Sequence, residues 1–294
     1  MSRFINPYTD FGFKRLFGTE GNKDLLIDFL NCLMPAKHQI QELNFLNVEQ
    51  NGEITSDRKA IYDIHCKSIY GDLFIVEMQK AKIKYFKDRA LFYVTMPIRD
   101  QAQRGEWDFK LLPIYYIAIL DFEYDEHDEI RKFDRTVQLR DEDGFVFYDK
   151  LGFRFLQMPY FQKTETELVT HYDKWCYFLK MLESFDSIPQ ILNEPVFEKA
   201  FKTAEFAALS SAERKEYEAN RLVYWELKSV IDTSREEGLA EGLVMGKAEG
   251  KIEGKAEGEL AKARKVAKGM KGKAYPIQDI IDLTGLSKSE IEKL

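Results

Sequence analysis

Two short runs of β-branched and aromatic residues, at positions 61–69 and 73–79, stand on either side of a Tyr-Gly-Asp segment. Runs of this composition favour β-strands, and a glycine between them is typical of a tight turn, so the pattern predicts a β-hairpin. Most neighbouring residues in this hairpin are apolar, and an unpaired carboxylate among them would be costly.

Three polar residues of the hairpin, Asp63, Glu77 and Gln79, are expected on one face because side chains alternate along a strand. If the turn centres on Gly71, Asp63 lies opposite Gln79 and diagonal to Glu77, at a separation of about 7–8 Å. One cation can bridge two carboxylates at that separation, which suggests a metal site. The alternative is that both acids pair with Lys or Arg across a half-exposed sheet.

The remaining hydrophobic pattern divides the chain near residue 165. Alternating or continuous apolar runs predict strands at residues 40–48, 111–122, 130–139, 145–148 and 153–157. Apolar positions repeated every three or four residues predict helices at residues 22–32, 85–104, 171–183, 197–209 and 212–232. Residues 1–20 are expected to be irregular, and Pro97 is expected to kink its helix. The order of elements predicts an α/β fold, a mixed sheet with helices on its faces, followed by an all-α region.

Glycine returns at every fourth position between residues 238 and 258. Four residues of a helix advance about 400°, so these glycines form a stripe that drifts slowly round the axis. Each costs ~1 kcal/mol relative to alanine. The stripe suits either close helix–helix contact in a homo-oligomer or a marginally stable spacer, and the spacer is the favoured interpretation.

The last twenty residues predict two short helices around Gly285, with a capping box at Ser287 and Glu290 that starts the second. This arrangement resembles a helix-turn-helix. A terminal helical hairpin with no role in DNA binding explains the pattern equally well.

The net charge of −7 argues mildly against a nucleic-acid partner, because phosphate contacts need Lys and Arg. The distribution of charge changes this picture. Acid is concentrated at residues 121–129, and a cluster at residues 262–273 holds six cations and no acid. A further basic group directly follows the hairpin and consists of Lys80, Lys82, Lys84, Lys87 and Arg89. A local basic surface is therefore compatible with an acidic whole.

Several classes of protein have no support in the sequence. No apolar run approaches the ~20 residues of a membrane span, and the first residues lack the apolar core of a signal peptide. The three cysteines, Cys32, Cys66 and Cys176, are far apart and suit a reducing cytoplasm. The four histidines show no metal-motif spacing, so neither serine–histidine hydrolases nor HExxH metalloproteases are indicated.

Asp63 followed by Glu77-Met78-Gln79 resembles the Asp…Glu-x-Lys active site of the PD-(D/E)XK nucleases, in the variant where glutamine replaces lysine. Further segments are similar to the Rpn family, the recombination-promoting nucleases and transposases of bacteria. These segments are DFGFKRLFG at residues 10–18, LLIDFLN at 25–31, VEMQ at 76–79 and the run from Arg89 to Tyr93. The resemblance covers roughly the first half of the chain, and the carboxy-terminal tail is similar in its general sequence character.

The resemblance implies a PD-(D/E)XK restriction-endonuclease-like core, with a mixed central sheet flanked by helices, and an all-α carboxy-terminal extension. The expected regions are a nuclease-like core, a helical region, a charged glycine-periodic helix or spacer and a terminal helix-turn-helix-like hairpin, at residues 1–165, 166–235, 236–273 and 274–294 respectively.

The resemblance also assigns roles to residues. Asp63 and Glu77 are the expected metal ligands, for Mg²⁺ or Mn²⁺, and Gln79 completes the catalytic group. Gln79 carries no charge, and Lys82 or Lys14 is the candidate to supply it. Asp10 and Lys14 are expected accessory residues, and Glu20 is a weaker metal candidate. Lys80, Lys82, Lys84 and Arg89 are the candidate nucleic-acid contacts.

The function implied is that of a Mg²⁺-dependent DNA endonuclease linked to recombination or transposition. The choice of DNA over RNA rests on the resemblance alone. One alternative is a catalytically inactive protein of the same fold that binds DNA or self-associates. Another is an oligomeric scaffold built on the glycine-periodic tail.

Overall fold

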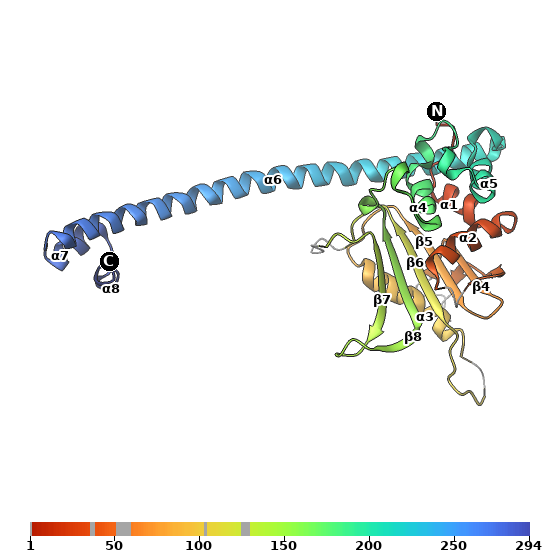
Figure 1. The fold of residues 1–294 in the computed structure, drawn as a ribbon, viewed down its shortest axis with the longest axis horizontal. Helices are drawn as coiled ribbons and strands as arrows, with labels where there is room; N and C mark the ends of the chain where they lie inside the picture. The colour runs from red at the N-terminus through yellow and green to blue at the C-terminus, as the bar shows by residue number, and fades with distance from the viewer. Residues whose placement is uncertain (1, 36–38, 51–59, 103–104, 125–129) are drawn as a thin grey trace. The chain divides into compact units, whose positions relative to one another are not determined.

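The computed structural model describes residues 2–35, 39–50, 60–102, 105–124 and 130–294. Contacts divide the chain into two compact units, Met1–Ser229 and Val230–Leu294. The first unit contains β-sheets and their helices, and the second is entirely helical (Figure 1).

A six-stranded mixed sheet forms the centre of the Met1–Ser229 unit. Its strands lie in the order β1 (Leu43–Phe45), β4 (Ile64–Ser68), β5 (Leu73–Gln79), β6 (Ile114–Leu120), β8 (Val146–Gln157) and β7 (Asp134–Arg140). The three strands β5, β6 and β8 run parallel, and the other neighbours pair antiparallel. A separate two-stranded sheet pairs β2 (Glu49–Gln50) with β3 (Ala60–Ile61). The predicted α/β fold with a mixed sheet is confirmed.

Helices cover both faces of the six-stranded sheet (Figure 1). One face carries α1 (Asp10–Phe17), α2 (Lys23–Leu33), α4 (His171–Met181) and α5 (Pro195–Ala204). These helices share a hydrophobic core with Phe74 and Val76 of β5. The other face carries α3 (Phe86–Arg99), which packs with Ile75 in a second core. Because side chains alternate along β5, Glu77 and Gln79 belong to the face that α3 covers.

The indole ring of Trp175 joins four helices of the first core. Its centroid lies 5.7 Å from the ring of Phe17 on α1, 5.8 Å from that of Phe29 on α2 and 4.8 Å from that of Phe197 on α5. Tilted and edge-on ring pairs of this kind add to the free energy gained by burial. Trp175 therefore fixes the position of α1 against the other helices.

A polar group between α2 and α4 adds to this packing. Asp28 Oδ1 lies 2.6 Å from both His171 Nε2 and Trp175 Nε1, and Cys32 Sγ lies close by. His171 Nδ1 lies 3.2 Å from a carboxylate oxygen of Glu194. The hydrogen bond to Asp28 and the two nearby carboxylates raise the pKa of His171, so this group acts as an ion-pair network.

The Val230–Leu294 unit contains the distal part of α6 (Ser211–Gly272), α7 (Ile277–Thr284) and α8 (Lys288–Glu292). Its small core consists of Ala267, Ile280, Leu286 and Ile291. The predicted capping box is present, because Ser287 accepts from the backbone N–H of Glu290 and the Glu290 carboxylate accepts from Ser287. Gly285 ends α7 at a φ of 69°, a conformation that glycine adopts without strain.

Three predicted boundaries were wrong. Residues 1–20 were expected to be irregular, but Thr9 accepts a hydrogen bond from Gly12 and caps α1, so Asp10–Phe17 is helical. The strands expected at 145–148 and 153–157 are one strand, β8. The glycine-periodic segment continues the preceding helix without a break, so both belong to α6.

Pro97 lies inside α3, two residues before its end. Proline has no backbone N–H, so the carbonyl oxygen of Tyr93, four residues earlier, loses its helical donor. The hydroxyl of Tyr62 donates to that oxygen instead, at 3.0 Å. This replacement bond explains how α3 continues through the proline.

No helix in the described ranges combines the length and the apolar character needed to cross a membrane.

We expect Gly12→Ala to destabilise the protein by roughly 1–3 kcal/mol, the usual cost of overpacking a tight site. A Cβ on Gly12 would lie 2.2 Å from the backbone oxygen of Asn6 and 2.8 Å from Thr9 Oγ1. Urea unfolding of the full chain measures the change. Gly21→Ala is the matched control, because a Cβ there meets nothing within 4 Å. Equal midpoints for the two variants would show that the backbone around Asn6 moves freely.

Candidate active site

The β4–β5 hairpin brings Asp63 and Glu77 together. Ser68 N–H donates to the Asp72 oxygen at 2.9 Å, so the loop contains three residues, of which Gly71 is the last. Gly71 has a φ of 99°, in the left-handed region that such a loop requires at its third position. The side chain of Leu112 packs beside this glycine, and a Cβ added to Gly71 would lie 3.2 Å from it.

This loop centres on Tyr70 rather than on Gly71, which changes the predicted register. Ile64 pairs with Val76, so one further step places Asp63 opposite Glu77. The expectation that Asp63 lies opposite Gln79 was therefore wrong, because the glycine takes the last position of the loop and not its middle. Direct opposition brings the two carboxylates closer than the diagonal arrangement would.

Backbone groups hold both carboxylates in place. Asp63 Oδ2 accepts a hydrogen bond from the backbone N–H of Met78 at 2.7 Å. Glu77 Oε1 accepts one from the backbone N–H of Asp63 at 3.2 Å. Since each acid is bonded to the strand that carries the other, their relative position is set by the sheet itself.

The electrostatics of the pair are unfavourable without a cation. The Glu77 side chain is only 1% exposed, and burial together with the charge of Asp63 raises its pKa to about 8. Burial also raises the pKa of Asp63, although the hydrogen bond from Met78 opposes the shift. Two neighbouring acids that resist ionisation are typical of sites that bind a divalent cation or share a proton.

Arg89 of α3 is the cation beside this pair. Its Nη2 lies 3.8 Å from Glu77 Oε2, and its Nη1 donates to Gln79 Oε1 at 3.4 Å. Gln79 Nε2 donates to Glu77 Oε2 at 2.8 Å. The guanidinium also lies 4.8 Å from the centre of the Tyr93 ring, which restricts its orientation. Arg89 thus stands where the charge that Gln79 lacks is needed, a role expected for Lys82 or Lys14.

The other candidate residues lie at varying distances from the pair. Asp10 and Lys14, one turn apart on α1, form an ion pair at 2.9 Å, and both are close enough for their charges to affect the pKa of Asp63. Lys80 is also close enough to interact electrostatically with Asp10 and Asp63, and burial lowers the pKa of Lys80. Lys82 and Lys84 are exposed beyond β5. Glu20 is engaged with Lys23 at 2.6 Å.

One residue of this region escaped the sequence reasoning. The backbone N–H of Asp121, directly after β6, donates to the backbone oxygen of Gln79 at 2.9 Å. Strands β5 and β6 are parallel, so polar residues that follow them meet at one edge of the sheet. The signal was an acid placed immediately after a fully apolar strand.

The donor set suits a hard divalent cation, because carboxylate oxygens are the protein ligands that Mg²⁺ and Mn²⁺ prefer. Asp63 and Glu77 are the residues that could hold it. Their raised pKa values are the physical observation behind this assignment, since a bound cation would stabilise both ionised forms.

We expect Glu77→Gln to be more stable than the unaltered protein at high pH in EDTA. The pKa of Glu77 is raised from 4.5 to about 8, so the folded protein favours the protonated form of this side chain. The folded protein therefore loses stability as pH rises from the unfolded pKa through the folded pKa, because the buried carboxyl group must then ionise. Denaturant unfolding should show an advantage of roughly 1–3 kcal/mol at about pH 9 and none at about pH 5. Glu216→Gln, on an exposed carboxylate of α6, should show no such trend. An advantage independent of pH would refute the explanation.

Comparison with known proteins agrees with the geometry. A family model described as the PD-(D/E)XK nuclease family transposase matches residues 7–234. This range includes the whole sheet, α1 to α5 and the first part of α6. No curated protein and no solved structure matches the chain. Since the family model covers well over half of the sequence, the chain belongs to the PD-(D/E)XK nuclease family of transposases.

Proposed function

We propose that the protein is a metal-dependent DNA endonuclease of the PD-(D/E)XK type that acts in recombination or transposition. One observation carries the proposal: Asp63 and Glu77 lie opposite each other in the sheet, and the pKa of each is raised. Family membership supports nuclease chemistry and DNA as the substrate.

Asp63 and Glu77 would hold Mg²⁺ or Mn²⁺. A divalent cation bound by two carboxylates lowers the pKa of a coordinated water and offsets the charge that develops on the phosphate. The protein contributes rigidity, because the backbone N–H groups of Met78 and Asp63 fix the two acids before substrate arrives. A site organised in advance loses little free energy to rearrangement during the reaction.

Gln79 and Arg89 would act together in place of the lysine of other PD-(D/E)XK enzymes. Gln79 can orient a water or a phosphate oxygen through its amide, and Arg89 supplies the positive charge. Their mutual hydrogen bond at 3.4 Å makes them one unit. The nearby Lys80, with the ion pair of Asp10 and Lys14, would complete the electrostatic field around Asp63.

The exposed basic residues after β5 would contact the DNA backbone. Lys82 and Lys84 extend the positive surface away from Arg89, and Lys84 Nζ lies 5.3 Å from the centre of the Tyr85 ring. Such contacts position DNA without reading its sequence.

Purified protein with Mg²⁺ should nick supercoiled plasmid, and EDTA should abolish nicking. Asp63→Asn and Glu77→Gln should each lower the rate at least roughly a hundredfold, because each removes one carboxylate ligand while keeping its shape. Glu216→Gln is the control and should cut at the normal rate.

Cleavage that survives in both variants would exclude this site. DNA binding without any cleavage would favour the alternative, an inactive protein of the nuclease fold that binds DNA. The absence of a charge on Gln79 would then explain the inactivity.

Arg89→Met should lower the cleavage rate roughly 10- to 100-fold, because it removes the cation next to Gln79. Adding Gln79→Lys to that variant should restore much of the rate by returning a positive charge to the same place. Lys215→Met removes an exposed cation outside the basic group that follows β5 and serves as the control. A double variant no faster than Arg89→Met would show that Arg89 acts by positioning α3 and not by its charge.

A further inference from the structure

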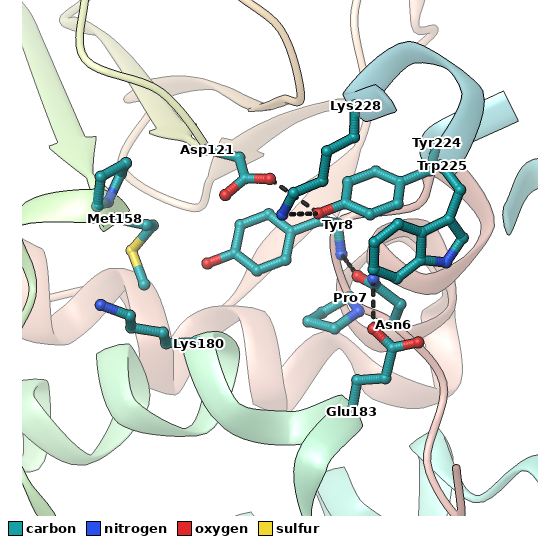
Figure 2. Close-up of a pocket in the computed structure, with 11 residues that line it drawn as sticks. Asn6, Pro7, Tyr8, Asp121, Met158, Lys180, Glu183, Tyr224, Trp225 and Lys228 are labelled. Atoms are coloured by element: carbon teal, nitrogen blue, oxygen red, sulfur yellow. Dashed lines mark hydrogen bonds between the residues drawn. The ribbon is translucent and has the colours of Figure 1, made fainter. Parts of the chain in front are cut away.

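A small polar pocket lies at the ends of β6 and β8, entirely within the Met1–Ser229 unit. Figure 2 shows its lining, which comes from the segment before α1, the residues after both strands, the end of α4 with Glu183 just beyond it, and α6. Its volume of about 260 Å³ is below the ~300–1,000 Å³ of pockets for drug-sized ligands. The pocket therefore suits one planar ring system. We call it the Tyr8 pocket.

The Tyr8 pocket adjoins the candidate active site. Asp121 lines it, and the backbone N–H of Asp121 donates to Gln79 at 2.9 Å. Neighbouring strands are about 4.8 Å apart, so the pocket begins one strand away from the carboxylate pair. Tyr8 also lies just two residues before Asp10, which opens α1. The charge of Asp10 acts on Asp63, so the segment that carries Tyr8 lies near the carboxylate pair.

The hydroxyl of Tyr8 is a polar group that a ligand in the pocket can reach. The residue is 7% exposed, and its hydroxyl makes no hydrogen bond with the part of the chain that the structure describes. In Figure 2 the ring crosses the pocket, with its hydroxyl directed to the side of Met158 and Lys180. This hydroxyl is not one of the buried polar atoms that lack a partner, so it is accessible from the pocket, where a ligand or a water can bond to it.

The other lining groups define the chemistry of that ligand. Lys180 and Lys228 are donors, while Asp121 and Glu183 are acceptors. Each already makes one hydrogen bond within the protein and has further hydrogen-bonding capacity. Two carboxyl groups in the pocket disfavour a phosphate, which would need donors alone. The ring of Trp225 is 46% exposed and provides an aromatic face. Donors, acceptors and an aromatic face together suit a nucleobase, whose edge carries both kinds of group.

We propose that the Tyr8 pocket binds one unstacked nucleobase of the DNA strand, at a nucleotide next to the cleaved phosphate. Trp225 stacks on the base, and the Tyr8 hydroxyl bonds to its edge. This proposal rests on the proposed nuclease function and names its substrate more closely. Removing a base from a duplex costs free energy, so the pocket favours unpaired or single-stranded segments near the cut.

Binding in EDTA tests the pocket without cleavage. Fluorescence anisotropy compares a labelled single strand with a strand of equal length made of abasic deoxyribose phosphates, using the full chain. The unaltered protein should bind the intact strand more tightly. Trp225→Ala should weaken that binding roughly 5- to 100-fold, the range expected for loss of one stacked base, and leave the abasic strand unaffected.

Tyr8→Phe removes only the hydroxyl and should weaken binding of the intact strand roughly 2- to 10-fold. Leu222→Ala changes an exposed side chain of the same helix as Trp225 and should bind both strands normally. A thermal melt for each variant verifies that the fold is intact.

Equal affinity of the unaltered protein for both strands would overturn the proposal. So would variants that weaken binding of the intact and abasic strands alike. If the pocket variants bind normally while plasmid nicking depends on Asp63 and Glu77, the nuclease stands and the pocket fails. If base-dependent binding is lost in the variants but no nicking occurs, the pocket stands and the nuclease function fails.

Discussion

The position of a buried acid, Glu77, next to the half-buried acid Asp63 is the constraint on which the candidate site depends. Strand β5 lies between β4 and β6, with helices on both faces, so Glu77 has almost no access to water. Its charge must be balanced by groups within the protein or by a ligand. Backbone N–H groups and Arg89 supply part of that balance, and the raised pKa of Glu77 shows that they do not complete it.

Local features of the sequence predicted much of this arrangement. Helix α2 followed from its apolar spacing, and the hairpin followed from two apolar runs around Gly71. The shared face of Asp63, Glu77 and Gln79 followed from alternation alone. Each of these inferences needs only neighbouring residues, and therefore each could be made without knowing how the chain folds back on itself.

The rest depended on information that a local pattern does not contain. A loop centred on Tyr70 and a loop centred on Gly71 differ by a shift of two residues in the strand pairing, and only the backbone conformation of residues 69–71 distinguishes them. Arg89 reaches Gln79 because α3 packs on the same face of the sheet, a tertiary contact. The Tyr8 pocket draws on five segments that are far apart in the sequence, so no spacing in the sequence could reveal it. Helix α1 was missed because Gly12 reads as a breaker, although tight packing against Asn6 requires it there.

Residues 238–258 of α6 are exposed throughout and hold six glycines, at each of which an added Cβ would meet open space. With each glycine costing ~1 kcal/mol relative to alanine, helix–coil balance rather than burial sets the local stability of this stretch. It opens at a lower free energy than the sheet does. A protease would thus find unfolded backbone here while the Met1–Ser229 unit is still native. Limited digestion would then separate the nuclease-family unit from the carboxy-terminal hairpin and leave its carboxylate pair undisturbed.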